Sequence, residues 1–191
     1  MIHAAALVSG DGAELQALLD SVFFGEIPGF SLSAVIATGR DCFALTRAGG
    51  AHVPGYVVDE SIFPNGASFS LALLNKLRDL DIDFIILAGF APKLSEGLAR
   101  AYRNRALGLR CALCPAFDSV KSGELCAAAI ERGVKYTGAT VYRPDESGEI
   151  GSILAQVPVE VLEGDSPQSL RRRVIDAAGP MLVEAVKTYS K

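Results

Sequence analysis

The chain has 191 residues, of which 50% are apolar, so it can bury one substantial core as a single domain over residues 1–191 without a disulfide or metal to support it. Its 18 basic and 22 acidic residues give a formal net charge of −4 with no basic stripe, and we therefore expect no nucleic-acid partner. No segment approaches the roughly 18 apolar residues of a membrane span, and no basic residue precedes the first apolar run, so we expect no membrane partner and a cytoplasmic location.

Apolar, β-branched runs alternate with segments of helical periodicity from the first residues onward, which is typical of βαβ units. The segments expected to form a mostly parallel, twisted sheet are 3–8, 32–37, 53–58, 84–88 and 106–109. The segments expected to form the flanking helices are 13–22, 42–48, 69–80 and 124–132. Two later runs, 137–142 and 153–161, flank a polar turn at 145–148 and predict a C-terminal antiparallel hairpin. The expected fold class is α/β.

A final helix is expected after the hairpin. Ser166 suits the N-cap and Pro167 the first helical position, so the helix should begin there and run toward Lys187. Because Pro180 lacks a backbone donor and its ring clashes with the preceding turn, we expect an interruption at Gly179-Pro180.

The first expected strand leads into a turn with two glycines at the start of a helix, a place where backbone N–H groups bind phosphates. The candidate binding residues of this turn are Gly10, Asp11, Gly12, Ala13 and Glu14. The carboxylates of Asp11 and Glu14 stand where an anion would lie, which raises the cost of binding one. A tight turn whose acids complement the helix dipole is therefore the alternative.

The cysteines and a run of three arginines are expected to have no binding or catalytic role. Cys42, Cys111, Cys114 and Cys126 are too few and too unevenly spaced for a disulfide framework, so we expect free thiols. The CxxC pair has no local histidine to complete a tetrahedral set, and we expect no metal. The three arginines at 171–173 are expected on a solvated helix face.

Four motifs follow one another along nearly the whole chain: LVSGDGAELQA at 7–17, IILAGF at 85–90, GVKYTGATVY at 133–142 and GDSP at 164–167. Together they resemble glycinamide ribonucleotide (phosphoribosylglycinamide) formyltransferase. The resemblance implies a single-domain formyltransferase fold. It also implies transfer of a formyl group from 10-formyltetrahydrofolate to the amine of glycinamide ribonucleotide in purine biosynthesis.

The residues that carry the chemistry in this family are not matched. The family's catalytic strand and loop read Asn-Ile-His-Pro-Ser, where this chain has GLRCA at 108–112. The asparagine and histidine, which stabilise the charge of the tetrahedral intermediate, correspond to Gly108 and Arg110. The family aspartate corresponds to Glu149 or, with the gap placed otherwise, to Gly148. The resemblance thus implies that no catalytic residue is retained and that ordinary formyl transfer is lost.

The resemblance also assigns the substrate pockets. The substrate phosphate would meet the turn at 10–14, where Ala13 and Glu14 replace a hydroxyl residue and an asparagine. The residues that would face the folate are Leu87, Gly89, Phe90, Ala91, Leu94 and Tyr142. Tyr142 replaces a family histidine, and Pro92 removes a backbone donor. We expect no bound cofactor, or 10-formyltetrahydrofolate if the family activity is kept.

Three functions stay open. The chain is an inactive binding or regulatory protein, an enzyme of altered chemistry that uses Arg110, Glu149 and Cys111, or a working or slow folate-dependent formyltransferase. Arg110 at the end of a strand either binds a small anion or pairs with Glu149 across the cleft. The sequence is compatible with a monomer or a homodimer.

Overall fold

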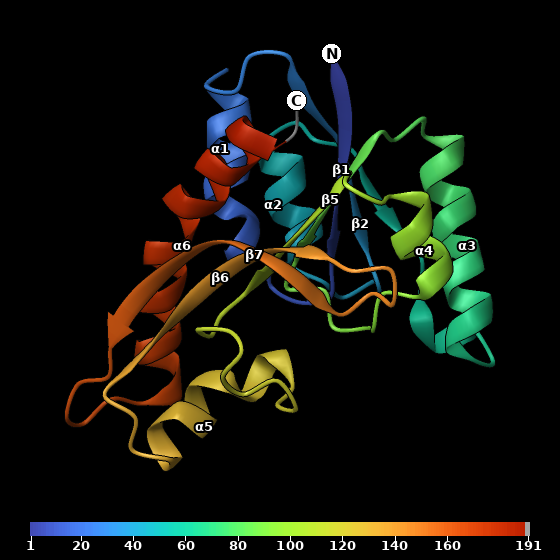
Figure 1. Cartoon of the computed structure of the whole chain (residues 1–191). Coiled ribbons are helices and arrows are strands. Elements are labelled where there is room, and N and C mark those ends of the chain that lie inside the picture. Colours follow the sequence, from blue (N-terminus) through green and yellow to red (C-terminus); the bar gives the residue numbers. More distant parts are fainter. Residues whose placement is uncertain (190–191) are drawn as a thin grey trace.

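A seven-stranded sheet runs through the centre of the structure, a computed structural model in which residues 1–189 are described (Figure 1). Its strands are β1 (Ile2–Val8), β2 (Phe30–Ala37), β3 (Gly55–Val57), β4 (Phe84–Ala88), β5 (Ala106–Arg110), β6 (Tyr136–Pro144) and β7 (Ile150–Glu160). They lie in the order β3-β2-β1-β4-β5-β6-β7, parallel from β3 to β5 and antiparallel from β5 to β7. The predicted α/β fold with a C-terminal hairpin is confirmed.

Helices cover both faces of this sheet (Figure 1). They are α1 (Gln16–Phe23), α2 (Ala44–Gly50), α3 (Gly66–Asp79), α4 (Glu96–Ala101), α5 (Leu125–Glu131) and α6 (Pro167–Tyr189), with short 3-10 helices η1 (Ala13–Leu15), η2 (Glu60–Ile62) and η3 (Ser122–Glu124). Alternate residues of β1 point to opposite faces. Ala4 and Ala6 join the core under α1, α2, α5 and α6, whereas Ala5 and Leu7 join the core under α3 and α4. None of the helices within residues 1–189 has the length and apolar character needed to cross a membrane.

Two local elements differ from the sequence-based prediction. The helix expected at 13–22 begins with the 3-10 turn η1 before α1. Helix α4 was not predicted, because it has only six residues and contains Gly97. It begins at Ser95, whose Oγ accepts the Leu98 N–H at 3.3 Å, and Leu98 is buried against the sheet. Burial rather than helix propensity stabilises this element.

The expected interruption of the final helix is wrong, because α6 continues through Pro180. Gly179 packs so closely on α1 that a Cβ there would lie 2.7 Å from the Cβ of Ala17, and Pro180 faces solvent. Packing of α6 against α1 therefore holds the helix together across the proline. The predicted start is confirmed, since the Ser169 N–H donates to Ser166 Oγ at 3.1 Å.

The carboxyl ends of β1, β4 and β5 lie side by side, since Leu7 pairs with Leu87 and Leu87 pairs with Gly108. The antiparallel strand β6 places Tyr142 directly opposite Gly108. The glycine turn, the loop after β4 and Arg110 at the end of β5 therefore meet at one edge of the sheet. Open α/β sheets bind their ligands at this edge.

Candidate functional site

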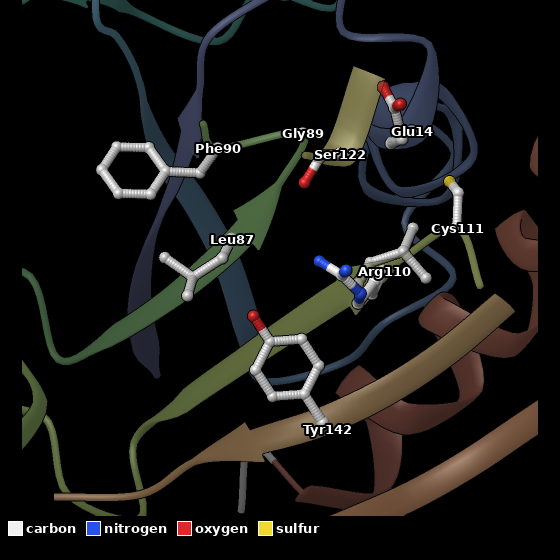
Figure 2. A pocket seen from close by; sticks show the side chains of 9 residues that line it. Glu14, Leu87, Gly89, Phe90, Arg110, Cys111, Ser122 and Tyr142 are labelled. Atoms are coloured by element: carbon white, nitrogen blue, oxygen red, sulfur yellow. The ribbon is translucent and has the colours of Figure 1, made fainter. Parts of the chain in front are cut away.

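Cavities open around Arg110 at this edge. Figure 2 shows one of about 40 Å³, and others of about 490 and 610 Å³ share lining residues with it. Arg110 and Ser122 line all three. The side chains that the resemblance assigns to the folate line the cavities of about 40 or 490 Å³: Leu87, Gly89, Phe90, Ala91, Leu94 and Tyr142. The structure therefore brings the predicted folate-facing residues together.

The side chain of Tyr142 occupies the space above Gly108. A Cβ at position 108 would lie 2.5 Å from both Cε1 and Oη of Tyr142, closer than any side chain tolerates. Burial raises the pKa of Tyr142 to about 12, so its hydroxyl stays protonated at neutral pH. The position that the resemblance assigns to the catalytic asparagine is thus filled from the opposite strand.

Of the two alternatives for Arg110, the ion pair with Glu149 is wrong. Nη2 of Arg110 donates to the main-chain oxygens of Phe117 at 2.6 Å and Val120 at 2.9 Å, while Nε is buried without an acceptor. Glu149 instead pairs with Lys93 Nζ at 2.5 Å on the surface. The loop after β5 folds back over Arg110, and the loop after β4 reaches the hairpin turn, so each group meets a nearer partner.

Arg171 of α6 binds both acids of the glycine turn. It donates to Asp11 at 3.0 and 3.1 Å and to Glu14 Oε1 at 2.8 Å. The Ala13 N–H also donates to Asp11 at 3.0 Å, and the Arg171 guanidinium holds the pKa of Asp11 below its usual range. The Asp11 carboxylate therefore accepts hydrogen bonds from the Ala13 N–H and from Arg171, two donors that could otherwise bind an anion at this turn.

The expected solvated face at 171–173 is wrong for two of its three arginines. Arg173 binds Asp165 at 2.6 Å, and Arg171 binds the glycine turn as described above. Of these three arginines, Arg172 alone is exposed and forms no ion pair with the residues that the structure describes. Because α6 packs across η1 and α5, two of the three directions on the helix face protein rather than water.

The Asp11–Arg171 contact should make part of the stability acid-sensitive. The pKa of Asp11 is lower in the folded protein than its ordinary value of 3.8. The ionised carboxylate therefore adds its full contribution to the free energy of unfolding above pH 3.8, and this contribution is lost as the pH falls through the folded pKa. We therefore expect the free energy of unfolding of Arg171→Gln, measured in urea, to fall less steeply than that of the wild type from about pH 4 to pH 2.

The neighbouring variant Arg172→Gln removes the same charge from an exposed position of α6 and serves as the control. It should keep the wild-type dependence on pH. The same pH dependence in Arg171→Gln and the wild type would contradict the role of this contact.

All four cysteines are free, as predicted. Cys111, Cys114 and Cys126 are buried, and burial raises the pKa of Cys111 to about 12. The Cys111 thiol is therefore neutral at physiological pH and is a poor nucleophile. Within residues 1–189, no group of histidine, cysteine or acidic side chains is arranged to hold a metal ion.

Sequence reasoning missed Ser122, Lys93 and Arg171 as residues of this site. Ser122 begins the short 3-10 helix η3 and Lys93 lies in the loop after β4, and no local pattern marks either residue. Arg171 had a usable signal. Two carboxylates in one tight turn repel each other and need a cation, and the arginines at 171–173 lie on the helix that covers the turn.

Comparison with known proteins agrees with this geometry. A family model described as formyl transferase matches residues 2–186. A phosphoribosylglycinamide formyltransferase from Mycobacterium tuberculosis (strain CDC 1551 / Oshkosh) is 35% identical over 182 residues, which cover 94% of this chain and 81% of that protein. A trifunctional purine biosynthetic protein from Drosophila pseudoobscura pseudoobscura is 31% identical, and the match covers 89% of this chain but 12% of that protein.

Solved structures show the same similarity. Glycinamide ribonucleotide transformylase 1 from Symbiobacterium toebii superposes with a TM-score of 0.91 at 33% identity, over 100% of this chain and 88% of that chain. The corresponding protein from Geobacillus kaustophilus gives a TM-score of 0.90 at 26% identity, over 100% of both chains. The chain therefore belongs to the formyl transferase family, among the phosphoribosylglycinamide formyltransferase-like proteins of purine biosynthesis.

Proposed function

We propose that this chain keeps the formyltransferase fold and a ligand-binding cleft but does not carry out ordinary formyl transfer. The position of the Tyr142 ring above Gly108 carries the proposal. In the family, an asparagine at this position donates a hydrogen bond to the formyl oxygen as negative charge develops there. Here even a methyl group has no room, so the donor cannot be regained without moving Tyr142.

The position of the catalytic histidine supports the same conclusion. Arg110 stays protonated near neutral pH, so it cannot exchange a proton with the reacting amine. Its Nη2 is already engaged by two main-chain oxygens. The chain has only two histidines. His3 lies near the amino end of β1 and His52 follows α2, and neither lines the cavities around Arg110.

Altered chemistry through Arg110, Glu149 and Cys111 gains no support. Glu149 is an exposed partner of Lys93, and the thiol of Cys111 is neutral because burial raises its pKa to about 12. We therefore propose a binding protein over an enzyme of new chemistry. We expect it to act in the cytoplasm, as a monomer or homodimer, with 10-formyltetrahydrofolate as a cofactor only if transfer is retained.

The substrate side of the cleft also opposes the family reaction. Glycinamide ribonucleotide would bring a phosphate to the glycine turn, where Asp11 and Glu14 already bind Arg171. A dianion would have to displace these carboxylates or lie against them, which Coulomb repulsion disfavours. This arrangement supports weak binding of the family substrate.

We expect calorimetry to detect only weak binding of glycinamide ribonucleotide to the wild type and tighter binding to Glu14→Asn. The substitution removes one negative charge and leaves Arg171 with a free donor for the phosphate. We expect a gain of about tenfold, the effect of one charge-assisted hydrogen bond.

Glu184→Gln is the control for this experiment, because it removes one negative charge from an exposed surface position that pairs with Lys187. Its affinity should equal that of the wild type. Low-micromolar binding by the wild type that Glu14→Asn does not tighten would show that the turn is not blocked electrostatically.

The proposal itself is tested by a formyl-transfer assay with 10-formyltetrahydrofolate and glycinamide ribonucleotide. We expect no turnover above the uncatalysed rate. Turnover comparable to that of an active relative would overturn the proposal.

A further inference from the structure

Unpartnered hydrogen-bond donors from three separate elements meet in one cavity. Figure 2 shows the polar ends of Arg110 from β5, Ser122 from η3 and Tyr142 from β6 directed toward the same space beside Leu87. Within residues 1–189, the hydroxyls of Ser122 and Tyr142 form no hydrogen bond. Because Tyr142 is protonated, its hydroxyl is available as a donor. Such a group of donors fits an acceptor that comes from outside the chain.

The charge of Arg110 is not neutralised by the protein. Its only acceptors in the described part of the chain are the main-chain oxygens of the 117–120 loop, all bound by Nη2, and its buried Nε has none. Carbonyl oxygens solvate a guanidinium but carry no net charge. A half-buried cation without a counter-ion is costly, and an anion at this place would lower that cost.

The acidic residues around the cavities do not serve as that counter-ion. Glu149 is bound by Lys93, and Glu14 is bound by Arg171 at the far end of the smallest cavity. Asp118 lines the cavity of about 490 Å³, and Glu60 and Glu124 line that of about 610 Å³. All three are exposed to water, and none forms an ion pair with Arg110 within the described residues. Because Glu14 lies close by, a dianion such as phosphate is disfavoured relative to a singly charged ligand.

The sizes and walls of the cavities define the rest of the ligand. A cavity of about 40 Å³ holds a group the size of a carboxylate, since one water needs about 10–15 Å³ by the same measure. It shares Phe90, Leu87 and Tyr142 with the cavity of about 490 Å³, which is the size of a small-molecule site. Leu94 and Ile150 extend the apolar wall of this second cavity.

We propose that this cleft binds a small monocarboxylate, with its carboxylate held by Arg110, Tyr142 and Ser122 and its apolar part lying along Phe90 and Leu94. The inference rests on the proposed function, because the space is free for such a ligand only if the formyl donor does not occupy it. Arg110 then has a role that differs from that of the histidine it replaces: it binds an anion and transfers no proton.

Calorimetry with benzoate, acetate and inorganic phosphate tests this inference on the full chain. Benzoate should bind the wild type more tightly than acetate, because its ring adds apolar contact, and phosphate should bind more weakly than either. Arg110→Gln should weaken benzoate binding at least about tenfold, and Tyr142→Phe should weaken it several-fold. Tyr142→Phe keeps the ring above Gly108 and the loop contacts of Arg110, so it remains informative even if Arg110→Gln does not fold.

Arg100→Gln is the matched control, because Arg100 forms an exposed pair with Glu96 on α4 and lines none of the cavities around Arg110. It should bind benzoate like the wild type. Failure of folded wild type to bind benzoate or acetate, or equal binding by wild type and Tyr142→Phe, would overturn the inference. The formyl-transfer assay tests the proposed function independently of this inference. If the chain neither transfers formyl groups nor binds carboxylates, the carboxylate site is refuted and the proposed loss of formyl transfer stands.

Discussion

Formyl transfer by this chain is expected to be at least about a thousandfold slower than by the phosphoribosylglycinamide formyltransferase of Mycobacterium tuberculosis under the same conditions. Loss of one oxyanion donor from an acyl-transfer site lowers the rate by about 10²–10³. Here Gly108 supplies no donor and Arg110 cannot replace the proton exchange of a histidine. Catalytic groups that act as a unit do not compensate for one another, so a further loss is expected from the second change.

The assay uses both purified proteins with 10-formyltetrahydrofolate and glycinamide ribonucleotide, and it follows release of tetrahydrofolate. A cooperative thermal unfolding transition of this chain controls for misfolded protein. The triple variant Gly108→Asn/Arg110→His/Tyr142→His should recover measurable transfer if it folds, because it restores the family residues around the formyl group. A wild-type rate within tenfold of the active relative would refute the loss of function.

Gly108→Ala is expected to lower the free energy of unfolding by about 2 kcal/mol. An added Cβ would lie 2.5 Å from atoms of the Tyr142 ring, and the ring must leave its place between β5 and the loop after β4. In the Tyr142→Ala background the same substitution should cost almost nothing, which gives a coupling energy of about 2 kcal/mol in a double-mutant cycle. Urea denaturation measures all four proteins.

Gly97→Ala in α4 is the matched control, since a Cβ at that position meets no atom within 4 Å. It should leave the stability unchanged or raise it by up to about 1 kcal/mol, the helix preference of alanine over glycine. An equal cost of Gly108→Ala with and without the tyrosine ring would exclude the steric explanation.

The fold could be predicted from the sequence because its signals are local and repeated. Each buried strand is a short apolar run, and each helix presents a periodic face, so the order of elements leads to the parallel sheet. Predictions failed where packing overrides local preference. α6 continues through Pro180 because its neighbour Gly179 lies against Ala17, and α4 forms because Leu98 is buried.

The candidate site was predictable in its location but not in its contacts. Strand ends marked by Gly89 and Arg110 meet at one edge of any such sheet, and the structure places them there. The partners of Arg110 are main-chain oxygens, which no residue pattern encodes. Pairing of Glu149 with Lys93 depends on how two loops approach each other, and the contact of Tyr142 with Gly108 depends on the register of β5 against β6.

The contact between Tyr142 and Gly108 also makes two positions of the chain depend on each other. A tyrosine ring in its present position excludes any residue with a Cβ at position 108. A side chain at position 108 therefore requires the ring to rotate away or to be replaced. The effect of any substitution at position 108 thus depends on the residue at position 142, so the two positions are epistatic.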